Sequence, residues 1–203
     1  MAEAIKMTYQ PKNFDHLIGI SGFSEQLLKN HFTLYQGYVN NTNKLIEEMA
    51  ILDKDNKTQT IEFSELKRRF GWEFNGMKLH EYYFENLTKN FVSLDKNSNF
   101  YKEITKQFGS YEAWERHFKS CALIRGIGWL ILFYDKTNKK FITTWVNEHN
   151  TGVLLDCVPL FVLDLFEHAY MLDYGLKRAD YVEAFFKVID WKVVVKRFNS
   201  III

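Results

Sequence analysis

The stretch Asp164-Leu-Phe-Glu167-His168-Ala-Tyr170 follows the apolar run Val158–Leu163 and places a carboxylate and an imidazole four residues apart. Oxygen and nitrogen donors at positions i and i+4 can converge on one metal ion. The pair alone is weak evidence for a metal site, because an Asp and a His at this spacing more often form a surface hydrogen bond. A metal site therefore requires further ligands elsewhere in the chain.

The composition indicates a globular protein. The chain has 203 residues, of which 47% are hydrophobic and 17% aromatic, enough for a sizeable core in one large or two small domains. Its 26 basic and 25 acidic residues nearly cancel, which argues against nucleic-acid binding through bulk charge. No apolar run reaches the roughly 18 residues that a membrane span needs. Residues 1–7 lack a basic segment followed by an apolar one, which predicts a cytoplasmic protein.

The first half of the chain has helical periodicity. Apolar residues recur at spacings of three and four between about residues 22 and 51, and Ser24 is a suitable N-cap. A polar break at residues 53–57 separates this segment from a second helix predicted near residues 64–86. Two helices joined by a short loop predict an antiparallel hairpin.

The second half changes its period. The predicted elements are a polar linker at 89–101, a helix capped by Ser110, strands at 128–135, 141–146 and 158–163, and helical structure over 167–198 broken near Gly175. The fold class is therefore α+β. An N-terminal helical hairpin domain (residues 1–92) precedes a C-terminal α/β domain (residues 93–203) that has a small three-stranded antiparallel sheet.

The motif quoted above, followed by Arg178-Ala-Asp-Tyr-Val and Val188-Ile-Asp-Trp191, resembles the iron/manganese superoxide dismutase family. The resemblance covers the chain from about residue 14 to residue 198. That family takes one histidine ligand from each N-terminal helix, and an aspartate and a histidine from the C-terminal half. The residues that match this set, in this order, are His31, His80, Asp164 and His168.

The first ligand departs from the family's spacing. Relatives usually place it eight residues before the tyrosine of Tyr-Val-Asn-Asn, whereas His31 stands seven before Tyr38 and Asn30 occupies the usual position. A separation of seven falls about 20° short of two turns, so His31 and Tyr38 share one face of a regular helix. A separation of eight needs an inserted residue such as a π-bulge. We therefore expect His31 to be the ligand; if Asn30 takes that place, the ligand is lost.

His149 is the candidate for the residue that hydrogen-bonds the solvent molecule at the metal. In manganese-type relatives a glutamine from this region has that role. In iron-type relatives the glutamine stands four residues before the second ligand, and the residue at that position here is Gly76. Strict alignment offers Glu148 as the rival. A carboxylate would repel a bound hydroxide, so His149 is preferred. The resemblance leaves the choice between iron and manganese open.

The resemblance also implies roles for Tyr38, Trp129 and Glu167. Tyr38 matches the gateway tyrosine of the substrate channel and the proton relay, and Trp129 matches an aromatic wall of the metal pocket. Glu167 matches a residue that bonds the ligand histidine of a partner subunit across a two-fold axis, which implies a homodimer, with a tetramer left open.

The function implied by the resemblance is superoxide dismutation. With one iron or manganese ion per subunit, the enzyme would convert superoxide to dioxygen and hydrogen peroxide, and it would involve neither nucleic acid nor a membrane. The alternative is a protein of the same fold that has lost this activity and serves as a binding or structural module. Missing ligands would be the expected mark of that alternative.

Overall fold

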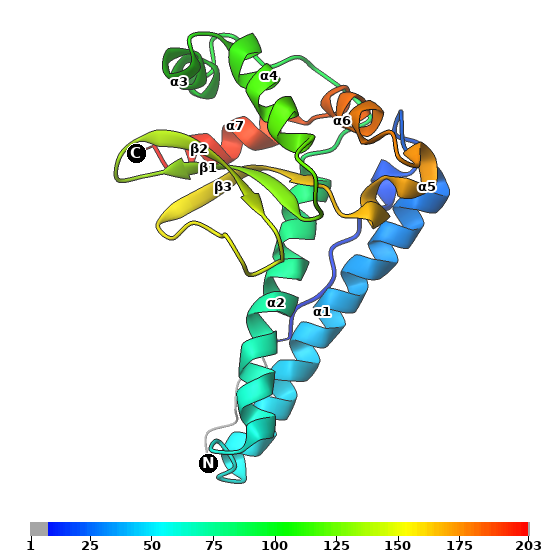
Figure 1. Cartoon of the computed structure of the whole chain (residues 1–203), viewed down its shortest axis with the longest axis vertical. Helices are drawn as coiled ribbons and strands as arrows, with labels where there is room; N and C mark the ends of the chain where they lie inside the picture. Colours follow the sequence, from blue (N-terminus) through cyan, green and yellow to red (C-terminus); the bar gives the residue numbers. More distant parts are fainter. Residues whose placement is uncertain (1–7, 203) are drawn as a thin grey trace.

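The computed structural model describes residues 8–202, so residues 1–7, on which the prediction of a cytoplasmic protein rested, lie outside the described part. Helices α1 (Glu25–Lys54) and α2 (Ile61–Glu85) form a long antiparallel hairpin that projects away from the rest of the molecule (Figure 1). Over residues 8–202, no helix combines the length and the apolar character needed to cross a membrane.

Local capping sets where the two long helices begin. Ser24 accepts a hydrogen bond from the backbone N–H of Leu27, as the sequence predicts. Helix α2 begins earlier than predicted because Thr60 is its cap, accepting from the N–H of Phe63 at 3.2 Å. The predicted hairpin is confirmed, and both helices differ from their predicted bounds by a few residues.

The three strands form an antiparallel sheet with the order β2-β1-β3, and they are β1 (Trp129–Asp135), β2 (Lys140–Val146) and β3 (Cys157–Asp164). Strand β1 lies in the centre and is buried along nearly its whole length, which explains its continuous apolar sequence. The register pairs Trp129 with both Val146 and Asp164. The first residue of β1 and the last residues of β2 and β3 therefore meet at one end of the sheet.

The remaining helical elements are η1 (Asp15–Leu17), α3 (Asn99–Phe108), α4 (Tyr111–Ala122), η2 (Glu167–Ala169), α5 (Met171–Tyr174), α6 (Arg178–Phe186) and α7 (Trp191–Asn199). Helices α3 and α7 contact the sheet, whereas α5 lies beside the upper end of α1 (Figure 1). Ser110 caps α4 as predicted. The predicted linker at 89–101 is wrong at its C-terminal end, where α3 begins after its cap Ser98. Helix α3 has ten residues, and Phe100, Ile104 and Phe108 recur on its inner face at helical spacing, so its apolar pattern is present but short.

The C-terminal helices have a second break in addition to the predicted one near Gly175. Residues between α6 and α7 leave the helix so that Ile189 pairs with Leu87 and Asp190 pairs with Val92. These bridges attach the C-terminal segment to the chain that follows α2. Helix α2 also packs against β3, so the hairpin and the sheet meet where α2 nears its end. The predicted α+β fold class is confirmed; the division at residue 92 stays a prediction.

Candidate metal centre

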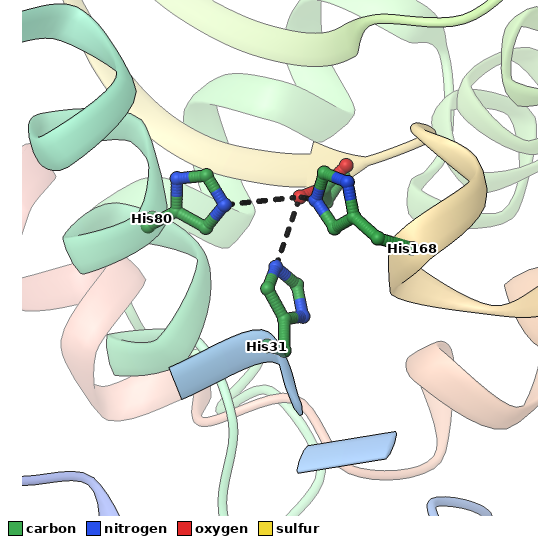
Figure 2. A group of neighbouring side chains, drawn as sticks. His31, His80 and His168 are labelled. Atoms are coloured by element: carbon green, nitrogen blue, oxygen red, sulfur yellow. Dashed lines mark hydrogen bonds and ion pairs between the residues drawn. The ribbon is translucent and has the colours of Figure 1, made fainter. Parts of the chain in front are cut away.

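Four residues from four elements converge at the junction of the hairpin and the sheet. They are His31 on α1, His80 on α2, Asp164 at the end of β3 and His168 in η2, and one donor atom of each lies within 4.8 Å of the others. Figure 2 shows the three imidazoles pointing toward one another from separate elements. His31, His80 and Asp164 are buried, and the side chain of His168 is 29% exposed. The structure thus brings together all four residues expected as metal ligands.

The donor atoms surround one oxygen of Asp164. The Oδ2 atom lies 3.2 Å from His31 Nε2, 3.1 Å from His168 Nε2 and 3.8 Å from His80 Nε2. Among the described residues, the buried His80 Nε2 has no hydrogen-bond partner. A buried polar atom without a partner costs free energy, and a metal ion would satisfy it. Three imidazoles and a carboxylate form a mixed nitrogen and oxygen set that fits iron or manganese better than magnesium.

Burial and the neighbouring side chains together determine the charge of the ligand groups. It lowers the pKa of His31, and it lowers the pKa of His80 well below the ordinary value, so both imidazoles are neutral, as metal binding requires. Burial alone would raise the pKa of Asp164. The neighbouring imidazoles of His168 and His31 outweigh burial and hold that pKa well below its usual range. His31 and His80 therefore offer neutral nitrogen donors beside one fixed negative charge.

Backbone contacts orient the ligands. His80 Nδ1 donates to the carbonyl oxygen of Gly76 at 2.6 Å, which leaves Nε2 free to face the other donors. The Oδ1 atom of Asp164 accepts from the N–H of Phe166 at 2.9 Å, which holds the carboxylate. The Tyr181 hydroxyl donates to the carbonyl oxygen of Asp164 at 2.8 Å.

The shortened spacing on α1 places His31, and not Asn30, in the cluster. Residues 25–54 form an α-helix throughout, and His31 and Tyr38 are both buried on its inner face. Asn30 is exposed and accepts a hydrogen bond from the side chain of Gln26 at 2.8 Å. The regular-helix geometry expected from a separation of seven residues is the one observed.

Tyr38, His149 and Trp129 form a buried chain of hydrogen bonds beside the ligands. Trp129 Nε1 lies 3.0 Å from His149 Nδ1, and His149 Nε2 lies 2.7 Å from the Tyr38 hydroxyl oxygen. Burial lowers the pKa of His149 to about 4, so its imidazole is neutral near pH 7. An indole N–H can only donate, so Nδ1 accepts and the single imidazole proton resides on Nε2. His149 therefore donates to Tyr38.

The rival Glu148 points to a different partner. Its side chain is exposed and accepts a hydrogen bond from Trp72 Nε1 at 3.1 Å, whereas His149 is only 1% exposed. The structure thus places His149 behind Tyr38 and leaves Glu148 outside the pocket. Glu167 lies exposed on η2, next to His168 in the chain.

Trp72 and Tyr181 contact the site but were not anticipated from the sequence. The Trp72 ring lies 4.4 Å from the His149 ring and 5.5 Å from the Tyr38 ring, measured between centroids. Trp72 precedes Gly76 by four residues, and Gly76 precedes His80 by four. This spacing places all three on one face of α2 and could have identified Trp72. Tyr181 acts through a backbone carbonyl, and no sequence signal marks such a contact.

Comparison with known proteins agrees with this geometry. Residues 96–197 match the family model described as iron/manganese superoxide dismutases, C-terminal domain. The chain is 34% identical to an iron superoxide dismutase of Aquifex pyrophilus and 35% identical to that of Aquifex aeolicus, in each case over 94% of this chain and 91% of the relative. It is also 34% identical to manganese superoxide dismutase 2 of Haloferax volcanii, over 87% of both chains. This similarity extends over most of the chain, so the chain belongs to the iron/manganese superoxide dismutase family.

Proposed function

We propose that this protein is a superoxide dismutase that holds one iron or manganese ion per subunit through His31, His80, Asp164 and His168. The observation that carries the proposal is the ligand cluster, in which a buried His80 Nε2, without a hydrogen-bond partner within residues 8–202, faces a charged carboxylate and two further imidazoles. Family membership supports the same activity. Sites of both metals occur among the relatives, whose names include iron and manganese enzymes.

An iron or manganese ion held by His31, His80, Asp164 and His168 would supply the one-electron redox chemistry that converts two superoxide ions and two protons to dioxygen and hydrogen peroxide. The chain's own task is to exclude bulk water and to deliver protons. The rings of Phe84 and Phe166 lie 4.8 Å and 5.6 Å from the ligand rings of His31 and His168. These apolar walls lower the local dielectric around the ligands.

Tyr38 is the group best placed to give up a proton in the pocket. Because His149 Nε2–H donates to the Tyr38 oxygen, the hydroxyl proton of Tyr38 is not used in that bond and remains available to a substrate. The Tyr38 ring stacks on the ligand ring of His80 at 5.1 Å, which places the hydroxyl group beside the ligands. Burial raises the pKa of Tyr38, so its hydroxyl group keeps its proton near pH 7. After Tyr38 gives up this proton, the Nε2–H of His149 stabilises its oxygen.

We further propose that the protein is a homodimer that pairs through the surface around η2 and α5. Glu167 and Met171 are exposed there, and the loop after α4 exposes Ile124 and Ile127. Arg178, the first residue of α6, ties that helix to the loop by donating to the carbonyl oxygens of Ile124 and Gly126. Exposed apolar patches rimmed by charge are typical of self-association surfaces. The side chain of His168, 29% exposed, lies in the same region, and in the proposed dimer a carboxylate of the second copy would contact it.

The enzymatic proposal is tested by measuring the metal content and the superoxide dismutase activity of the same samples. The protein would be expressed in iron-rich and in manganese-rich medium, and each sample analysed by mass spectrometry and by superoxide consumption. We expect about one metal ion per subunit with activity in at least one sample. His80→Ala should lose the metal, whereas His117→Ala, which removes an exposed histidine outside the cluster, should retain it. A metal-loaded protein without activity would instead support a binding or structural module.

A further inference from the structure

A hydrogen bond outside the ligand cluster joins α2 to the loop between β2 and β3. Trp72 Nε1 donates to Glu148 Oε2 at 3.1 Å, between residues 76 positions apart in the chain. Glu148 immediately precedes His149, the inner residue of this loop. The bond therefore anchors the loop at the position next to the residue that donates to Tyr38.

The Trp72 ring also covers His149 directly. The two ring centroids are 4.4 Å apart, and the Arg69 guanidinium group lies 3.9 Å from the centroid of the indole. Arg69 is itself held by an ion pair with the buried carboxylate of Glu73 at 2.7 Å. The indole is thus fixed between Arg69 and His149. Such stacking of a guanidinium group on an indole contributes about 0.5–1 kcal/mol at partly exposed sites.

His149 is buried although its loop is not. Residues 147, 148 and 150 are exposed and have no regular secondary structure, whereas His149 is 1% exposed. Loops of this kind open locally at low free-energy cost unless a tertiary contact holds them. The contacts that hold His149 in place include its own bonds to Trp129 and Tyr38 and the attachment of Glu148 to Trp72.

We propose that Trp72 and Glu148 form a clasp that positions His149 against Tyr38. Glu148 holds the loop by its carboxylate, and the Trp72 indole closes the outer side of the His149 ring. Both are positioning residues, since neither lies among the four ligands. This inference rests on the proposed function, because the position of His149 matters to turnover only if Tyr38 and His149 deliver protons.

Chemical labelling of His149 tests the clasp without relying on activity. Diethyl pyrocarbonate acylates accessible neutral imidazoles, and the modified residue is identified by mass spectrometry on the metal-loaded protein. We expect labelling of His149 to accelerate about fivefold in Glu148→Ala and in Trp72→Phe, since each removes one modest hydrogen bond. The exposed His16 and His117 provide reference rates on the same chain.

Three further variants make the labelling result specific. Glu148→Gln keeps an oxygen that can accept from the indole, so its labelling rate should match that of the unmodified protein. Glu65→Ala removes an equivalent charge at an exposed position of α2 and should also leave the rate unchanged. The double variant Trp72→Phe/Glu148→Ala should label no faster than either single variant, because both changes remove the same bond. Unchanged labelling in Glu148→Ala, or additive effects in the double variant, would overturn the clasp.

Kinetics then test whether the clasp serves the reaction. In Glu148→Ala and Trp72→Phe, kcat should fall about fivefold with kcat/KM unchanged, because the path to the metal stays the same while proton delivery slows. Faster labelling with an unchanged kcat would overturn the positioning role. If the metal-loaded unmodified protein consumes no superoxide, the proposed function fails, and the labelling result still decides whether the clasp exists.

Discussion

At the scale of single residues, neighbours determine what each group near the metal ligands can do. The indole N–H of Trp129 determines which nitrogen of His149 carries the proton, and burial keeps that imidazole neutral. Gly76 allows the Tyr38 ring to lie against α2, because a Cβ atom at position 76 would approach Tyr38 Cδ1 to 2.6 Å. Because these contacts involve His149 and Tyr38 and not the four ligands, substitutions there should affect turnover more than metal content.

Replacing His149 by alanine should leave about one metal ion per subunit and lower kcat about tenfold or more. His149 bonds to Tyr38 and Trp129 but not to the ligand atoms, so its loss interrupts proton delivery alone. Metal analysis and steady-state kinetics on the same preparation check this. Loss of the metal in His149→Ala would show instead that His149 is a ligand.

Gly76→Ala and Gly37→Ala should have opposite effects on stability. Gly37 also lies in a long helix, but a Cβ atom there meets nothing within 4 Å. Gly37→Ala should therefore stabilise the protein by about 0.5–1 kcal/mol through helix propensity. Gly76→Ala should destabilise it by about 1–3 kcal/mol, because Tyr38 must move. Urea unfolding of both variants measures the difference, and a stabilising Gly76→Ala would contradict the close approach to Tyr38.

At the scale of elements, caps and strand register place the site residues. Ser24, Thr60, Ser98 and Ser110 each accept a backbone N–H at the start of a helix, which defines the first turn. The register of the sheet aligns Trp129 with Asp164, so an aromatic wall and a ligand emerge at the same end. Helix beginnings follow from local chemistry, whereas the meeting of β1 and β3 requires pairing between distant segments.

Ser110→Ala should lower the stability of the protein by about 1 kcal/mol, or about 2–4 °C in Tm. The Ser110 hydroxyl accepts from the N–H of Ala113 at 3.0 Å, and alanine leaves that N–H without a partner. Ser120→Ala in the same helix is the matched control. The Ser120 hydroxyl only donates back to the carbonyl oxygen of Arg116, so its removal should be neutral. Equal shifts in the two variants by calorimetry would reject the capping role.

At the scale of the whole molecule, a few buried polar contacts join the hairpin to the C-terminal half. Arg197 on α7 donates to the side chain of Asn86, to the carbonyl oxygen of Leu160 and to Glu85 at the end of α2. Lys12 approaches the same glutamate at 2.7 Å. These contacts hold α2, β3 and α7 together behind the metal ligands, and they make the stability of this junction dependent on charge.

Glu85→Gln should destabilise the protein near pH 7 and have little effect in acid. Partial burial would raise the pKa of Glu85, but the hydrogen bonds from Lys12 and Arg197 outweigh burial and lower it. A carboxyl group with a lowered pKa in the folded state stabilises the protein above its unfolded pKa of about 4.3, and this stabilisation is lost as the pH falls through the folded value.

The expected difference between Glu85→Gln and the unmodified protein is about 1 kcal/mol at pH 7, discounted for partial exposure. Urea unfolding at pH 7 and near pH 3, at one protein concentration, measures it. Glu65→Gln, at an exposed position of the same helix, is the control. A difference between the two proteins that persists undiminished in acid would show that the ion pair is not its source.

Glu167→Ala should weaken the proposed homodimer. Glu167 is exposed beside His168, and the variant removes the carboxylate that the proposed dimer would set against the partner's equivalent imidazole. Sedimentation over a range of concentrations should show a higher dissociation constant, whereas Glu112→Ala, on an exposed face of α4, should behave as the unmodified protein. A fully dimeric Glu167→Ala protein with unchanged metal content would reject this role.

Local features of the sequence predicted the helical hairpin and the three strands, and the ligand set followed from the family resemblance. Apolar periodicity and caps define α1, α2 and α4, and the motif at residues 164–170 identified the family that implies His31 and His80. Helix α3 was missed although Phe100, Ile104 and Phe108 recur at helical spacing, because the polar residues before it extended the predicted linker into its first turn.

Only the tertiary structure decided which residues around the metal ligands contact one another. The sequence already favoured His149 over Glu148. The bonds of His149 to Trp129 and Tyr38, the proton on its Nε2 and the bond from Trp72 to Glu148 depend on segments brought together by helix packing and strand register. The residue types of neighbouring positions cannot reveal such contacts, because the exposed Glu148 and the buried His149, which is 1% exposed, are adjacent in the chain. Burial and hydrogen-bond direction are properties of the assembled fold, and they determine the protonation state on which turnover depends.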